Sequence, residues 1–210
     1  MKKLFFGLLL VSALGALSSC KDSGKIPAPD VTSVPLILAR VSSDVTKSYF
    51  DTQRARASAT ELPTLANPTR PVFEFTFDVP DQRDVQIKAV EVYKSFRRDR
   101  IGPRALVGSY SSFPATVSIN SQDALTGLQQ LSNTTPPALN DLLGTTPGMR
   151  NPILSGDLVI FTFEYVLQNG TRVILTPLTE VKTASGTTVK VISGTQINPP
   201  YAVQAKFFVL

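Results

Sequence analysis

The chain has 210 residues, with 21 Lys and Arg against 16 Asp and Glu, and this mild net charge of +5 does not favour nucleic acid as a partner. It contains no histidine, no tryptophan and one cysteine, so it lacks the commonest general base, the commonest metal ligand and any internal disulfide. Sixteen prolines, together with many Thr, Ser and Val, favour short strands joined by turns over a helical protein.

Residues 1–19 have the pattern of an export signal peptide. Two lysines precede a mostly apolar run, Leu4 to Leu17, which is shorter than the roughly 18–20 residues that a membrane-spanning helix needs. The run ends in Leu17-Ser18-Ser19 before Cys20, and this resembles the lipobox of bacterial lipoproteins. The resemblance implies cleavage before Cys20 and acylation of its thiol and its new amino group; the alternative is a signal peptide without lipidation. Two acyl chains hold a protein on a membrane stably.

Residues 20–32 follow as the lipidated cysteine and a polar tether with Gly and Pro and no apolar period. Asp22, close to the anchor, partly matches the acidic export tag of surface lipoproteins in Bacteroidota. We therefore expect a bacterial outer-membrane lipoprotein and take exposure on the cell surface as a hypothesis. Residues 33–210 are predicted to form one β-sandwich domain.

The first half of this domain is predicted to contain two strands separated by a long irregular stretch. Residues 34–41 read as an edge strand, since a proline lies near its start. Residues 42–70 are polar and hold either a short strand near residues 48–50 or a mobile loop. Residues 72–79 alternate strictly, with Phe73, Phe75 and Phe77 on one side, as in a strand with one buried face. A sugar-stacking platform is the alternative for this aromatic row.

The turn after this strand carries three aspartates at a spacing of three residues, Asp78, Asp81 and Asp84. Several oxygen ligands close together suit a calcium ion. Aspartates are also ordinary turn residues, and no Asp-Gly loop or terminal Glu completes a calcium motif. We expect neither a metal nor a cofactor.

A basic hairpin is the candidate contact surface. Strands are predicted at residues 85–93 and 105–110, and the tip between them, residues 94–104, contains five basic residues and one acidic residue. Such a tip could contact an anionic partner, for example an acidic glycan or lipid phosphates. The alternative is a solvated loop that protects a sheet edge. The candidate contact residues are Tyr93, Phe96, Arg97, Arg98 and Arg100.

The second half is predicted to contain further strands and a short helical insertion. A strand is expected at 113–119, a helix from Asn120 or Ser121 to Leu131, and a second helix at 138–143. A hairpin follows, with a strand at 158–167, a two-residue type I′ turn at Asn169-Gly170 and a return at 171–176. Residues 181–197 alternate weakly around Ser185-Gly186, and residues 201–210 form a terminal strand.

Seven or more short strands with turn signals about every ten residues predict an all-β, antiparallel sandwich of the immunoglobulin or fibronectin type III kind. One or two short helices are inserted near residues 121–143. The aromatic row of residues 73–77 is expected to face the row Phe161, Phe163 and Tyr165 across the interior.

Four segments carry a family resemblance: residues 90–95 (Val-Glu-Val-Tyr-Lys-Ser), 112–117 (Ser-Phe-Pro-Ala-Thr-Val), 155–157 (Ser-Gly-Asp) and 161–164 (Phe-Thr-Phe-Glu), the last followed by Asn169-Gly170. They resemble immunoglobulin-like accessory lipoproteins of outer-membrane uptake systems of the starch-utilisation type in Bacteroidota. The resemblance implies a non-enzymatic binding role. Partners of this role are the membrane, through the anchor, and an outer-membrane transporter, another lipoprotein or a glycan.

Two other functions stay open from the sequence. The first is a structural scaffold subunit of an outer-membrane complex. The second is a glycan-acting hydrolase with two carboxylates, although nothing in the sequence places two carboxylates across a cleft.

Overall fold

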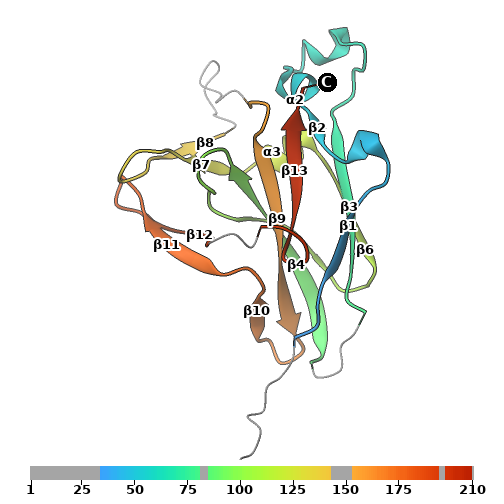
Figure 1. Ribbon diagram of the computed structural model, residues 1–210, viewed down its shortest axis with the longest axis vertical. Helices are drawn as coiled ribbons and strands as arrows, with labels where there is room; N and C mark the ends of the chain where they lie inside the picture. Colours follow the sequence, from blue (N-terminus) through green and yellow to red (C-terminus); the bar gives the residue numbers. More distant parts are fainter. Residues whose placement is uncertain (1–33, 81–84, 143–152, 194–196, 210) are drawn as a thin grey trace, which may run out of the picture. The chain divides into compact units, whose positions relative to one another are not determined.

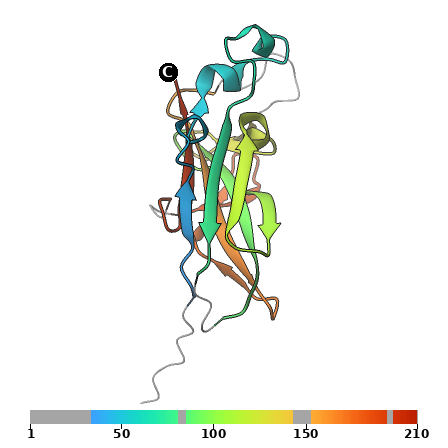
Figure 2. The same ribbon diagram turned by 90° about the vertical axis from the view of Figure 1, so that its right-hand side faces the viewer.

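The computed structural model describes residues 34–80, 85–142, 153–193 and 197–209. Two sheets form the body of the domain (Figures 1 and 2). The smaller sheet has the order β1 (Leu38–Val41), β3 (Val72–Asp78) and β6 (Ala115–Asn120). The larger sheet has the order β2 (Phe50–Asp51), β13 (Ala202–Phe208), β9 (Leu158–Leu167), β4 (Ile87–Arg97) and β5 (Ala105–Tyr110), with β10 (Arg172–Ile174) also paired to β9.

The pairing is antiparallel in both sheets except between β2 and β13, which run parallel. Two further hairpins, β7 (Gln129–Leu131) with β8 (Leu139–Asp141) and β11 (Leu178–Lys182) with β12 (Thr188–Ile192), lie to the left of β9 in Figure 1. The all-β prediction is confirmed.

Aromatic side chains from both sheets fill the space between them. Phe73, Phe75 and Phe77 of β3 are fully buried. The Phe73 ring stacks on that of Phe161 with centroids 5.8 Å apart, and the Phe75 ring lies 5.1 Å from the same ring. The predicted inward orientation of the β3 aromatic row is therefore confirmed, and burial of each ring contributes roughly 1.5–3 kcal/mol to stability.

The short strand predicted within residues 42–70 is confirmed, and it is β2. Around it the chain forms the 3-10 turn η2 (Val45–Lys47), the helix α2 (Thr52–Arg56) and the 3-10 turn η3 (Leu62–Thr64). Short polar side chains start two of these elements, because Asp44 accepts a hydrogen bond from Thr46 N and Asp51 accepts one from Arg54 N. The edge strand predicted at 34–41 is shorter than expected and begins at Leu38.

The hairpin tip predicted at 94–104 begins later than predicted. Strand β4 continues to Arg97, because its partner β9 is long enough to pair with residues Ile87 to Arg97. A β-bulge between Val92 and Tyr93 interrupts the pairing with β5. The tip itself is confined to the residues between Arg97 and Ala105.

The predicted helices in 121–143 are mostly wrong. Helix α3 covers only Ser121–Leu125 and is capped by the Asn120 side chain. The backbone leaves the helical path at Thr126, with a ψ of 130°, and Gly127 follows with a φ of 72°. Residues 129–131 and 139–141 instead pair as β7 and β8, where backbone groups find partners across a hairpin. Leu125, Leu128 and Leu131 are all buried, so their inward positions were predicted correctly but not their conformation.

The hairpin of β9 and β10 has a longer turn than predicted. Leu167 O accepts a hydrogen bond from Gly170 N (2.9 Å), and Leu167 N donates to Thr171 O (2.9 Å), so the loop has three residues with Gly170 at φ 83°. The predicted two-residue turn is wrong for this reason. The weak alternation at 181–197 corresponds to the hairpin β11–β12, and the terminal strand is β13; residues 194–196 and 210 lie outside the described residues.

Strand β9 is buried on both faces, which the alternating pattern did not predict. One face contributes Phe161, Phe163 and Tyr165 to the main core. On the other face Ile160 packs with Ile192 of β12 in a second, small apolar cluster. The hairpin β11–β12 thus covers part of the outer face of the larger sheet.

Candidate functional site

The structure does not assemble the predicted contact residues into one exposed basic patch. Phe96 is fully buried in the main core, so its prediction as a contact residue is wrong. Tyr93 is half-buried, with the guanidinium of Arg104 4.5 Å from its ring centre. Arg97 is partly buried at the end of β4 and Arg100 is exposed.

Arg98 is held in an ion pair beneath the hairpin tip. Its Nε and Nη2 atoms donate to Asp157 Oδ1 (2.9 Å) and Oδ2 (2.7 Å), and Leu154 N donates to the same carboxylate (2.7 Å). Only 3% of the Asp157 side chain is exposed, and this hydrogen bonding raises the pKa of Arg98. Arg98 therefore joins the tip to the turn before β9.

Lys94 lies on the inner face of β4 and is buried. Its ammonium donates to the backbone carbonyls of Asp123 and, at 2.8 Å, Thr126, which end helix α3. Burial lowers the pKa of Lys94. Lys94 therefore helps to hold α3 against the sheet. A partner at the surface could not reach it.

Two carboxylates lie directly opposite each other on the outer face of the larger sheet. Glu91 of β4 is paired in register with Glu164 of β9. Arg172 binds both, with Nη1 2.6 Å from Glu91 Oε2 and 3.1 Å from Glu164 Oε2, and Arg104 forms a second ion pair with Glu164. The sequence could not predict that these carboxylates lie together, because neither strand alone specifies the register in which β4 and β9 pair.

The chemistry of this pair does not favour hydrolysis of a glycan. Hydrogen bonds from Arg172 and Tyr93 hold the pKa of Glu91 below its ordinary value. A general acid of a glycosidase needs a raised pKa. Glu164 is buried and neutralised by two arginines, so the pair is an ion-pair network that joins three strands.

This network predicts a loss of stability in acid. Because the folded-state pKa of Glu91 is lowered, its contribution is present above the unfolded pKa of about 4.3 and is lost as the pH falls through the lower folded value. Half of the Arg172 side chain is exposed, so solvent screens the pair and we expect the contribution to be small. Thermal melting at a series of pH values should show a smaller acid dependence for Glu91→Gln than for the wild type. The exposed Glu180→Gln serves as control, and equal behaviour of both variants would contradict the assignment.

The calcium alternative is tested only in part, because Asp81 and Asp84 lie outside the described residues. Among the residues that the structure describes, no three carboxylate or thiol side chains are grouped as a metal site would require. No helix within the described ranges is long and apolar enough to span a membrane.

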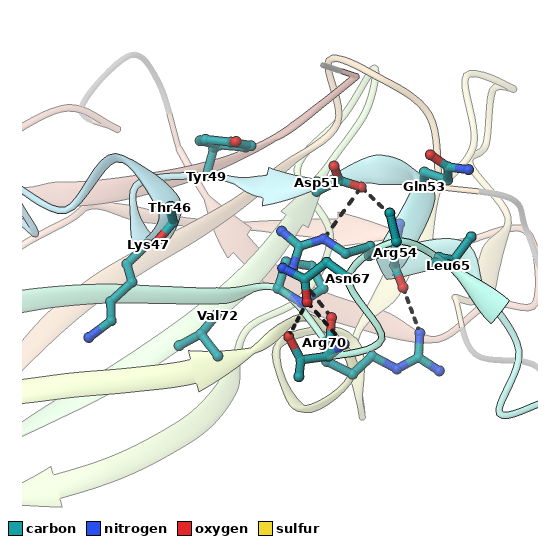
Figure 3. A pocket seen from close by; sticks show the side chains of 13 residues that line it. Thr46, Lys47, Tyr49, Asp51, Gln53, Arg54, Leu65, Asn67, Arg70 and Val72 are labelled. Atoms are coloured by element: carbon teal, nitrogen blue, oxygen red, sulfur yellow. Dashed lines mark hydrogen bonds and ion pairs between the residues drawn. The ribbon is translucent and has the colours of Figure 1, made fainter. Parts of the chain in front are cut away.

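A cavity of about 610 Å³ lies in the segment between β1 and β3, which the sequence had left without a function. Figure 3 shows it from close by. Its volume is within the roughly 300–1,000 Å³ of small-molecule sites. Polar and apolar groups both line it, and the lining residues are Thr46, Lys47, Tyr49, Asp51, Gln53, Arg54, Leu65, Ala66, Asn67, Thr69, Arg70, Pro71 and Val72.

Backbone hydrogen bonds hold the two arginines of this cavity in place. Arg70 Nη1 donates to the carbonyls of Arg54 (2.9 Å) and Ala55 (3.2 Å) in helix α2. Arg54 Nε lies 3.9 Å from Asp51 Oδ1, and only 15% of its side chain is exposed. In Figure 3 the two guanidinium groups lie at different places along the cavity, and the Lys47 ammonium points away from Arg54.

A second cavity of about 590 Å³ adjoins the first, because Gln53 and Leu65 line both. Its other lining residues are Thr52, Arg56, Ala57, Glu61, Thr64 and Val209. Both cavities are built by the segment around α2, which Figure 1 shows beside the C-terminal end of β13. Asp44 and Asp51, each able to cap a helical turn, were the sequence signals that could have predicted local structure here.

We found no family model, no curated protein and no solved structure that matches the chain.

Proposed function

We propose that this chain is a membrane-anchored, non-enzymatic lipoprotein whose β-sandwich binds a ligand or partner in the bacterial cell envelope. The observation that carries the proposal is the apolar run that ends in Leu17-Ser18-Ser19-Cys20. An acylated Cys20 would fix the protein to the outer membrane, and the partial tag at Asp22 supports exposure on the surface. The lipid anchor is the one chemical modification that the proposal requires.

We further propose that the domain is a fibronectin type III-like or immunoglobulin-like sandwich. Support comes from the strand order. The main strands of the smaller sheet, β1, β3 and β6, correspond to A, B and E, and the order β5-β4-β9-β13 corresponds to C′, C, F and G. Strand D has no counterpart within the described residues. Such sandwiches present ligands and partners at their ends, where the connecting segments lie.

The binding site that we propose is the pair of cavities around α2, in place of the basic hairpin. Of the hairpin's candidate residues, Phe96 is buried in the core and Arg98 is paired with Asp157. The cavities instead offer a concave surface that combines apolar lining with polar side chains, which is the usual form of a small-molecule site.

Mass spectrometry of the N-terminal peptide tests the anchor. From the native bacterium we expect a chain that begins at Cys20 and carries at least two acyl groups, and we expect Cys20→Ala to lose them and to leave the membrane fraction. Ser23→Ala, in the tether, is the control and should stay acylated and membrane-bound. The peptide mass also identifies a variant that stays in the membrane through an uncleaved leader. A wild-type chain without acyl groups on Cys20 would overturn the proposal.

A membrane partner that purifies with the wild-type chain in fixed proportion would favour the scaffold alternative over a binding protein.

A further inference from the structure

In the first cavity, two of the three cationic side chains are paired with carboxylates of the described residues and the third is not. Lys47 is paired with Glu74 at 3.1 Å, and Arg54 lies within 3.9 Å of Asp51. Arg70 has no carboxylate partner among the described residues. Of the three cations that line the first cavity, Arg70 is therefore the one without a carboxylate partner in the part of the chain that the structure describes.

Arg70 also presents its donors in a fixed direction. Its Nη1 is held by two carbonyls of helix α2, whereas Nε and Nη2 have no hydrogen-bond partner within the described residues. A guanidinium binds carboxylate or phosphate oxygens with two parallel N–H donors. Because the side chain is already oriented by the protein, an incoming anion would meet ordered donors.

An unpartnered buried hydroxyl borders the adjoining cavity. Thr52 is 2% exposed and lines this cavity, and its Oγ1 has no hydrogen-bond partner within the described part of the chain. Buried polar atoms are nearly always hydrogen-bonded, so an unpartnered one calls for an unseen partner such as water or a ligand. The apolar side chains of Leu65 and Val209 line the same cavity.

We propose that the two adjoining cavities form one site for a small organic anion. Its carboxylate or phosphate group binds Arg70, and its uncharged remainder extends past Leu65 into the adjoining cavity beside Thr52. Tyr49, Gln53 and Asn67 supply further polar contacts in the first cavity. This inference rests on the proposed binding function and assigns to it the chemical class of the ligand.

Titration calorimetry of the full-length protein in detergent tests the inference. The probes are glucuronate, a sugar phosphate and glucose, which compare a carboxylate, a phosphate and a neutral sugar of similar size. We expect the anions to bind with a Kd of about 1 mM or tighter and glucose to bind more weakly by roughly tenfold. In a detergent-free sample of the unanchored Cys20→Ala protein, vesicles of phosphatidylglycerol, compared with phosphatidylcholine, distinguish a lipid headgroup from a free anion as the source of the phosphate.

Variants then assign the binding to Arg70. Arg70→Gln should weaken anion binding by roughly ten- to a hundredfold, because a hydrogen-bonded charge is removed. Arg70→Lys keeps the charge without the fork and should recover only part of the affinity. Arg40→Gln, an exposed arginine on β1, is the control and should bind as the wild type does. A thermal melt confirms that each variant is folded.

Failure of this inference differs from failure of the proposed function. Equal binding of glucose and the anions, no anion binding, or the same affinity in Arg70→Gln and Arg40→Gln would each overturn the anion site. The acylation of Cys20 is measured separately and does not depend on any of these results.

Discussion

Replacing Phe75 by aspartate is expected to unfold the sandwich domain. Phe75 is fully buried at the middle of β3, where its ring contacts those of Phe73, Phe161 and Phe163. Loss of a buried phenyl ring alone costs about 3–5 kcal/mol, and the aspartate would add an unpaired charge in the core. Domains of this kind have a total stability of about 5–15 kcal/mol, and this chain has no disulfide to compensate.

Circular dichroism and thermal melting of the purified variant test this expectation. The matched control is Thr116→Asp, which places the same charge on the exposed face of the neighbouring strand β6. The control should melt close to the wild type, since exposed substitutions rarely change stability by more than about 0.5 kcal/mol. A cooperative melt of Phe75→Asp at the wild-type temperature would show that the aromatic row does not face the core.

Local patterns predicted the strands with one buried face. In β3 the alternation of Phe73, Phe75 and Phe77 with polar residues predicts both the strand conformation and the face that is buried. Strand β9 was found for the same reason, because one of its faces carries a row of aromatics. Its second buried face was not predicted, since the residues of β9 do not show that the hairpin β11–β12 packs on it.

Short apolar segments were the least predictable part of the fold. Leu125, Leu128 and Leu131 have a helical spacing, yet only the first lies in α3. A spacing of three residues shows that side chains share a buried side and cannot distinguish one helical turn from a turn followed by a strand. The positive φ of Gly127 and the pairing of β7 with β8 decided the outcome.

The candidate site depends on pairings that a single sequence does not contain. Arg98 was predicted as a free basic side chain because its partner, Asp157, is 59 residues away. The cavity was missed for a similar reason, because residues 42–70 show no periodicity and acquire their structure from caps and from contact with β13. A charged loop in a sequence is therefore weak evidence for a contact surface until the partners of its charges are known.

The ion pair of Arg98 with Asp157 gives the second large expected effect. Asp157→Asn should destabilise the domain by about 3 kcal/mol, because it replaces the buried carboxylate that the Arg98 Nε and Nη2 atoms bind. The side chain of Arg98 is 19% exposed, which places the expected cost at the low end of the range for buried pairs. The hydrogen bond from Leu154 N to the carboxylate is also weakened.

A double-mutant cycle in urea separates the ion pair from general effects of substitution. Arg98→Met removes the buried charge, so adding Asp157→Asn to it should cost much less than Asp157→Asn costs in the wild type. Glu180→Gln, an exposed carboxylate on β11, is the control and should leave the unfolding midpoint unchanged. Additive costs in the double variant would contradict a direct coupling of the two side chains. The expected coupling instead means that Arg98 acts within the fold by joining the hairpin tip to the turn before β9.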